Sequence, residues 1–180
     1  IRGSIERLTA IEDGVSEKVR AQYEENPYPR WSRVFAETQA LPVDAYIGMR
    51  FPGVPYRPLG NRAPEILIAG CGTGQHAIQR AQQFQSANVL AIDLSLASLS
   101  YAIRKTKELG LANLRYAQGD ILALDGDRTF DIIDSSGVLH HLKEPLTGWR
   151  RMADLLRPGG LMHIGLYSAT ARRDINTARD

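Results

Sequence analysis

Alternation of strand-like and helix-like segments over the last two thirds of the chain constrains its fold more than any other feature. Five short apolar runs are typical of strands, at residues 65–69, 88–92, 114–117, 130–134 and 161–166. Amphipathic segments typical of helices occur at residues 74–84, 94–109 and 146–156. Strands that alternate with helices form a parallel sheet covered on both faces. The sequence therefore predicts an α/β three-layer sandwich with a mostly parallel sheet.

Residues 1–60 have a different character and form a leader, helical first and then irregular. Ser16–Glu25 is predicted to be a helix with Ser16 as its N-cap, ending before Asn26-Pro27 because proline disfavours helical backbone in the preceding residue. A second short helix is expected at Trp31–Ala40. Residues 41–64 hold five of the nine prolines and are expected to be irregular. We place residues 61–180 in one core domain and expect another helix from Ser168 onward.

Composition argues against nucleic-acid and membrane partners and bears on the location in the cell. The net charge of +2 is scattered along the 180 residues, so we expect no nucleic-acid partner. Apolar runs fall well short of the ~20 residues of a membrane helix, so we expect no membrane partner. Cys71 is the single cysteine and cannot form an internal disulfide, which favours a cytoplasmic location.

Residues that follow the strands are the candidate binding residues, since ligands of open parallel sheets bind beyond the carboxyl ends of the strands. Gly70-Cys71-Gly72-Thr73-Gly74 follows the first strand and allows a ligand to approach the backbone closely. Asp93 follows the second strand, where it can accept hydrogen bonds from ribose hydroxyls or cap the next helix. Asp120 follows the third strand and can bind an adenine amino group or stabilise a turn, with Ile121 packing on the ring or in the core.

The segment after the fourth strand combines small residues with two histidines. Ser135, Ser136 and Gly137 leave room for a ligand, and backbone carbonyls there can hold an ammonium group. His140 and His141 are adjacent, whereas two ligands on one helix face need a spacing of three or four. We therefore predict no metal site.

Together these segments resemble the class I S-adenosylmethionine-dependent methyltransferases. The resemblance covers residues 61 to about 166 and is carried by ILIAGCGTG (66–74), VLAID (89–93), AQGDI (117–121), FDIIDSSGVLHHL (130–142) and RPGG (157–160). It implies a Rossmann-like fold, S-adenosyl-L-methionine as cofactor and S-adenosyl-L-homocysteine as product. It also implies that the cofactor is bound by Gly70, Cys71, Gly72, Thr73, Gly74, Asp93, Leu94, Asp120, Ile121, Ser135, Ser136 and Gly137.

Two departures from the family pattern are visible. The family often has an acidic residue one or two positions before the first loop glycine, where this chain has Ala69 and Ile68. We expect either weaker cofactor affinity or a neighbouring residue that compensates. The family sheet normally has seven strands, and only fourteen residues follow Leu166. We therefore expect the core to stop after its fifth strand, with contacts to missing parts of a parent chain or to a second copy in a homodimer.

The leader carries a resemblance of its own. YEENPYPRW (23–31) looks like the leader of bacterial methyltransferases fused to tetratricopeptide repeats. Its aromatic residues either cover the cofactor or pack the leader on the sheet.

The resemblance implies methyl transfer to a small-molecule or protein acceptor. Transfer is an in-line displacement at an activated methyl, so the protein mainly aligns the reacting atoms. A base is needed only for a protonated acceptor, and His140 or His141 is the candidate catalytic residue.

Three other functions have some support in the sequence. Gly72–Ala77 fits the pattern G-x-G-x-x-A of NAD-dependent oxidoreductases. That function does not explain the residues that follow the third and fourth predicted strands. Asn26-Pro27-Tyr28 lacks the preceding apolar strand that DNA adenine methyltransferases need, which excludes that class. A non-catalytic module that binds S-adenosylmethionine or a partner stays open.

Overall fold

Six parallel strands form one sheet in the order β1-β4-β3-β2-β5-β6, within the residues that the computed structural model describes (1–34, 40–60, 62–126, 128–168 and 170). The strands are β1 (Glu6–Arg7), β2 (Glu65–Ala69), β3 (Asn88–Asp93), β4 (Leu114–Gln118), β5 (Phe130–Ser136) and β6 (Leu156–Gly165). The helices are α1 (Gly14–Glu25), α2 (Val43–Arg50), α3 (Gln75–Gln83), α4 (Leu96–Glu108) and α5 (Pro145–Asp154). Short 3₁₀ turns lie at η1 (Arg2–Ser4), η2 (Ile121–Ala123) and η3 (Leu139–His141).

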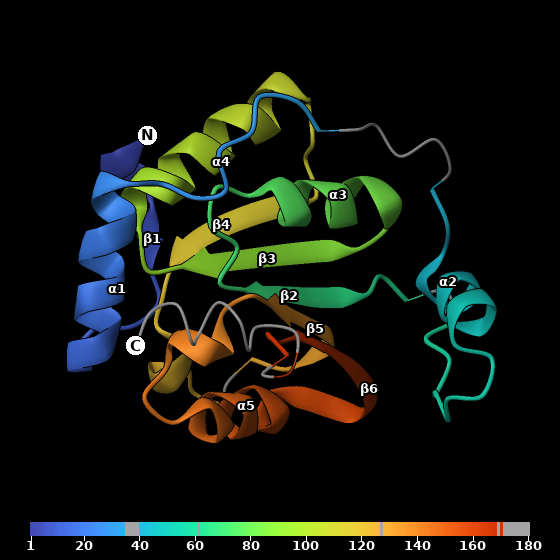
Figure 1. Cartoon of the computed structure of the whole chain (residues 1–180). Helices are drawn as coiled ribbons and strands as arrows, with labels where there is room; N and C mark the ends of the chain where they lie inside the picture. The colour runs from blue at the N-terminus through green and yellow to red at the C-terminus, as the bar shows by residue number, and fades with distance from the viewer. Residues whose placement is uncertain (35–39, 61, 127, 169, 171–180) are drawn as a thin grey trace.

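Both faces of the sheet are buried, as Figure 1 shows: α3 and α4 cover one face and α5 covers the other. Alternate residues of β2 therefore enter different cores. Ile66 and Ile68 pack with Ile78 of α3, whereas Leu67 packs with Met152 of α5. This explains why β2 is an unbroken apolar run, since a strand covered on both sides needs apolar residues at every position.

The leader reaches both ends of the sheet. Helix α1 lies across the carboxyl ends of the strands, and α2 lies beyond the amino end of β2 (Figure 1). Strand β1 joins the sheet edge, where Glu6 pairs with Ala117 of β4. None of the described helices is long and apolar enough to cross a membrane.

The α/β prediction and its mostly parallel sheet are confirmed, with strands at all five predicted places. The helix predicted at 94–109 is present, and Gly110 follows its C-cap with a φ of +66°, the left-handed conformation expected there. β1 was missed because a two-residue strand leaves no periodic signal.

Three predictions for the leader are wrong. Asp13, not Ser16, caps α1, because its carboxylate accepts from the amides of Val15 and Ser16. Residues 31–34 are not helical, since the carbonyl of Trp31 is bound by the Tyr101 hydroxyl, and residues 35–39 lie outside the described residues. Residues 41–64 are not wholly irregular: α2 forms there because Pro42 precedes its first turn and its apolar side is buried.

The end of α5 was also predicted too late. The helix stops at Asp154, not at residue 156, because the carbonyl of Leu155 accepts from the amide of Phe130 and draws the chain into the sheet. Leu156 already pairs with Phe130, and the register shifts between Phe130 and Ile132. The helix expected from Ser168 is absent at Ser168 itself, and residues 169 and 171–180 lie outside the described residues.

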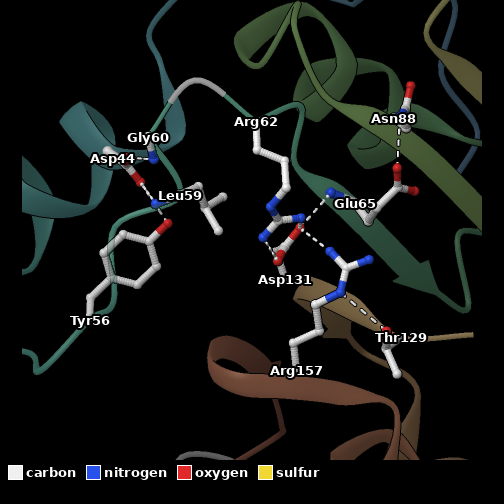
Figure 2. Close-up of polar contacts among 10 residues, drawn as sticks. All are labelled: Asp44, Tyr56, Leu59, Gly60, Arg62, Glu65, Asn88, Thr129, Asp131 and Arg157. Carbon is white, nitrogen blue, oxygen red and sulfur yellow. Dashed lines mark hydrogen bonds and ion pairs between the residues drawn. The ribbon is translucent and has the colours of Figure 1, made fainter.

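Two carboxylates fix the junction between leader and sheet, shown in Figure 2. Asp44 of α2 accepts from the Tyr56 hydroxyl at 2.8 Å and from the amides of Leu59 and Gly60, both at 2.9 Å. Asp131 of β5 is 2% exposed. It accepts hydrogen bonds from the Arg62 and Arg157 guanidinium groups and from the Glu65 amide, at 2.5 to 2.9 Å.

We predict that Asp131→Asn lowers the free energy of unfolding by about 2 kcal/mol near neutral pH, because two cations lose their buried counter-charge. Burial raises the pKa of Asp131, but hydrogen bonds from Arg62, Glu65 and Arg157 lower it below 3.8 overall. A lowered pKa stabilises the fold above pH 4, and this contribution is lost as the pH falls through the lowered value. Urea unfolding from pH 7 to pH 3 measures the difference.

Glu6→Gln is the control, since Glu6 and Arg128 form an exposed pair at 3.6 Å and should contribute little. Equal effects of the two substitutions would contradict the assignment.

Candidate functional site

A cavity of about 350 Å³ lies at the carboxyl ends of the strands, and residues of α1 form part of its wall. This volume suits a small-molecule ligand. Its walls come from α1, the turn at Tyr28 and Pro29 (the leader turn), the start of α3 and the loops after β2, β3, β4 and β5. The predicted site residues that line it are Gly70, Cys71, Gly72, Asp93, Leu94, Asp120, Ile121, Ser136, Gly137 and His141.

The glycine loop after β2 is held between β3 and the leader. The Gly72 amide donates to Asp93 Oδ2 at 2.7 Å, and the Thr73 amide donates to the Tyr28 carbonyl at 3.1 Å. Gly72 has a φ of +53°, and a Cβ there would lie 2.4 Å from the Tyr28 carbonyl oxygen. Only glycine fits this position, so the backbone can form the floor of the cavity.

Asp93 is organised by backbone amides. Besides the Gly72 amide, it accepts from the Ser95 amide at 2.9 Å, and Ser95 rather than Asp93 caps α4. Burial raises the pKa of Asp93, and the amide hydrogen bonds oppose this rise. The carboxylate is thus preoriented at the cavity wall.

Asp120 and Ile121 form the wall after β4. Asp120 is 3% exposed, and its Oδ1 accepts from the Leu122 amide at 2.9 Å. Its own amide donates to the Thr9 hydroxyl at 2.8 Å, which ties the leader to this loop. Ile121 presents a buried apolar surface beside the carboxylate.

Four predicted residues do not line the cavity. The Thr73 hydroxyl donates to the Pro29 carbonyl and accepts from the Trp31 indole, so it anchors the leader. Gly74 precedes α3 with a φ of +86°, and a Cβ there would lie 2.5 Å from Cβ of Ala102. The Ser135 hydroxyl donates to the Ala69 carbonyl within the sheet. The His140 ring lies next to the rings of His141 and Tyr167, with centroids 4.2 and 4.1 Å away.

His141 contacts α1 at the cavity wall. Tyr23 Oη lies 3.4 Å from His141 Nε2, and both residues line the cavity. Burial lowers the pKa of His141 below 6.5, so the imidazole is neutral at pH 7. A neutral imidazole can accept a proton, which is the role that the sequence predicted for His140 or His141.

The aromatic residues of the leader divide between the two expected roles. Tyr23 and Tyr28 line the cavity, whereas Trp31 packs on the core through its bond to Thr73 and its contact with the Tyr101 ring. Cys71 also lines the cavity, but burial raises the pKa of its thiol, so it is not a ready nucleophile.

A buried carboxylate that the sequence analysis missed lies beside the glycine loop. Asp134 of β5 pairs in register with Ile68, one of the two positions where an acidic residue was missing. Asp134 is 2% exposed and contacts His76 at 3.1 Å, Arg80 at 3.1 Å and His163 at 3.0 Å. Burial raises its pKa, but these partners, His76 first, lower it to about 2 overall. His76 lines the cavity, so Asp134 fixes a polar group of the wall.

Val15, Ser16 and Val19 of α1 are further lining residues that the sequence did not reveal. Their position depends on α1 folding across the sheet, for which the local sequence gives no signal. In the described parts of the chain, no three His, Cys, Asp or Glu residues are grouped to hold a metal ion.

Comparison with known proteins agrees with this architecture. Residues 66–160 match the family described as methyltransferase domain. An uncharacterized protein of Synechococcus sp. is 32% identical over 96% of this chain and 42% of its own length. The trans-aconitate 2-methyltransferase of Deinococcus radiodurans is 37% identical over 62% of this chain and 39% of its own length.

Solved structures show the same fold at low sequence identity. PKMT2 from Rickettsia typhi, solved in complex with AdoHcy, has a TM-score of 0.67 at 20% identity, over 85% of this chain and 29% of that one. The [4+2]-cyclase SpnF has a TM-score of 0.60 at 20% identity, over 89% of this chain and 62% of that one.

This chain spans less than half the length of the two curated relatives. The family match covers more than half of the chain, from the start of β2 to the middle of β6. The chain therefore belongs to the methyltransferase domain family.

Proposed function

We propose that the domain binds S-adenosyl-L-methionine in the cavity at the carboxyl ends of the strands and transfers its methyl group to a small-molecule or protein acceptor. The observation that carries this proposal is that Asp93 and Asp120, from neighbouring strand ends, line one cavity with the glycine loop. The Tyr28 carbonyl occupies the side of Gly72 where a Cβ would lie, so main-chain atoms of the loop and the leader bound this part of the cavity.

Each part of the cofactor has a partner in this proposal. Asp93 accepts from the ribose hydroxyls, while Asp120 and Ile121 bind the adenine. Gly70, Cys71 and Gly72 lie along the methionine portion, and the backbone at Ser136 and Gly137 meets its ammonium group. Leu94 supplies apolar surface beside the ribose.

Asp134 compensates for the missing acidic residue at Ile68 in this proposal. It lies on the neighbouring strand at the same level and stays ionised because its cationic and imidazole partners lower its pKa. It acts through His76, which lines the cavity at the start of α3.

Bound S-adenosylmethionine supplies a methyl group already activated by the positive charge on sulfur. The chain then has to hold the acceptor atom in line with the methyl carbon and the sulfur. It also has to exclude water, and α1 and the leader turn do this by covering the cavity. His141 is our candidate to take the acceptor proton, since it is neutral and lines the cavity. His140 supports the orientation of the His141 ring through their contact.

The relation to repeat-fused methyltransferases and the location in the cell are also proposals. The YEENPYPRW leader supports a relation to methyltransferases fused to tetratricopeptide repeats, and the buried free thiol of Cys71 supports a cytoplasmic location. A fold shared with a cyclase does not fix the reaction, so the reaction needs direct tests.

The first test of this proposal concerns cofactor binding. Asp93→Ala should reduce the affinity for S-adenosylhomocysteine at least tenfold in isothermal titration, because the ribose loses a charged acceptor. Asp44→Ala is the matched control, since Asp44 also accepts backbone amides but lies at the opposite end of the sheet. Absence of binding by the unmodified chain would overturn the proposed function.

A second prediction tests Asp134. Asp134→Asn should weaken S-adenosylhomocysteine binding about threefold to tenfold through the loss of His76 positioning. Binding of 5′-methylthioadenosine, which lacks the amino-acid portion, should not change. Asp131→Asn, on the same strand and equally buried, is the control and should affect neither ligand. An equal loss of affinity for both ligands would show that Asp134 does not act on the amino-acid portion of the cofactor.

A third prediction concerns catalysis. In a labelled-methyl transfer assay with an acceptor found by screening, His141→Gln should reduce the rate about a hundredfold while S-adenosylhomocysteine affinity is kept. Because burial lowers the pKa of His141, the unmodified rate should hold steady near pH 7 and fall only below pH 6.5. An unchanged rate in the variant would exclude His141 as the base.

A further inference from the structure

The contact between Tyr23 of α1 and His141 of η3 joins two titratable side chains at the cavity wall. Tyr23 Oη lies 3.4 Å from His141 Nε2, within reach of a hydrogen bond, and the two rings meet edge to face with centroids 6.2 Å apart. Both residues line the cavity. They are 118 positions apart in the sequence, so no local pattern could have predicted the pair.

The end of α1 is held in place on the opposite side of Tyr23. The Tyr23 carbonyl accepts from the Ser95 hydroxyl at 3.0 Å, and the Glu24 carboxylate accepts from the Leu96 amide at the start of α4. The backbone at Tyr23 is therefore attached to the segment after β3, while its hydroxyl reaches the 3₁₀ turn after β5. These attachments limit the movement of the phenol relative to the imidazole.

The acidities of the two groups set the direction of this hydrogen bond. Burial and then the charge of Asp93 raise the pKa of Tyr23 above 10.0, so the phenol is protonated at neutral pH. Burial lowers the pKa of His141, so its imidazole is neutral. A phenol is a stronger acid than a neutral imidazole N–H, and an unprotonated imidazole nitrogen is a strong acceptor. We therefore expect Oη to donate to Nε2, which leaves the ring proton of His141 on Nδ1.

This direction decides which atom can receive a proton from an acceptor. The lone pair of Nε2 is already engaged by the phenol, and Nδ1 carries the ring proton, so neither nitrogen of His141 is open to the acceptor. The lone pairs of Tyr23 Oη can still accept a hydrogen bond, because a phenol oxygen donates one and accepts others. A proton that leaves the acceptor therefore reaches His141 through Tyr23.

We propose that Tyr23 is the catalytic residue that contacts the methyl acceptor, with His141 behind it as the final base. The acceptor proton moves to Oη as the phenolic proton moves to Nε2, so Tyr23 ends as a neutral phenol and His141 as an imidazolium. The electron pair released on the acceptor forms the bond to the methyl carbon, and the pair of the broken carbon–sulfur bond stays on sulfur.

The inference rests on the proposed function, because it takes His141 to be the base in methyl transfer. It adds a catalytic residue from the leader, outside the loops that follow the strands. It also gives the class of acceptor, which is a molecule whose reacting oxygen or nitrogen carries a proton.

The chain offers a matched control in Tyr56. Its hydroxyl also donates to a side chain, Asp44, at 2.8 Å. This pair lies at the opposite end of the sheet from the cavity, and Tyr56 does not line the cavity. Tyr23→Phe and Tyr56→Phe therefore each remove one phenol hydroxyl and one hydrogen bond between side chains, and only the first removes them at the site.

The first experiment locates the ring proton of His141. Long-range ¹H–¹⁵N NMR spectra of the chain with S-adenosylhomocysteine, recorded above neutral pH, distinguish the two tautomers of a neutral imidazole. The unmodified chain and Tyr56→Phe should show the Nδ1–H tautomer. Tyr23→Phe should shift His141 toward the Nε2–H tautomer, which free histidine prefers, because the donor to Nε2 is lost. A ring proton on Nε2 in the unmodified chain would overturn the proposal.

The second experiment measures the relay through transfer rates, with the acceptor that a labelled-methyl screen of phenols, alcohols and amines identifies. Tyr23→Phe should lower the rate about a hundredfold, as expected for His141→Gln, because either change interrupts the same proton path. The double variant should be no slower than either single variant, since the two groups act as a unit. Tyr56→Phe should transfer at the unmodified rate. An unchanged rate in Tyr23→Phe, or losses that multiply in the double variant, would overturn the relay.

Isothermal titration with S-adenosylhomocysteine separates this inference from the proposed function. Failure of the unmodified chain to bind overturns the proposed function and the relay with it. If the unmodified chain binds but its His141 carries the proton on Nε2, only the relay is overturned. Tyr23→Phe should keep the affinity of the unmodified chain within about twofold. A loss of affinity as large as the loss of rate would show that Tyr23 binds the cofactor, and would overturn its catalytic role.

Discussion

The hydrogen bond from the Gly72 amide to the Asp93 carboxylate is the contact on which the site depends. It joins the loop after β2 to the end of β3 and sets the orientation of the carboxylate at the cavity wall. The neighbouring Thr73 amide binds the Tyr28 carbonyl, so the same loop also receives the leader. The close approach of these segments is available only to glycine at position 72, which links the composition of the loop directly to the shape of the cavity.

The site has two halves with different physical character. The ends of β3 and β4, with α1 above them, combine carboxylates with apolar side chains such as Ile121 and Val19. On the other side, the segment after β5 presents His141, and the start of α3 presents His76, which is held by the buried Asp134 of β5. Under the proposed function, the first half recognises the nucleoside, while the second holds the amino-acid portion and the acceptor. Such a division lets acceptor specificity change without altering cofactor recognition.

The sequence predicted those parts of the structure that local pattern determines. Apolar runs such as Glu65–Ala69 and the glycines after them identified the sheet and the strand ends, because a buried parallel strand needs apolar residues throughout. Features set by contacts distant in sequence were not predictable. Asp134 gave no signal of its partnership with His76 and Arg80 of α3 and His163 of β6, because these contacts join three separate elements. Trp31 was predicted to be helical, but its tertiary bonds to Thr73 and Tyr101 override local preference.

The shortness of β1 has a consequence for the local stability of the sheet edge. Only Glu6 and Arg7 pair with β4, so the first part of the leader is attached to the sheet by a few backbone hydrogen bonds. Detaching this edge exposes Ile5 and Leu8, which pack on the core, and leaves the five longer strands intact. Opening of this edge therefore costs less free energy than global unfolding, so amide hydrogen exchange should be faster in the N-terminal segment than in the central strands.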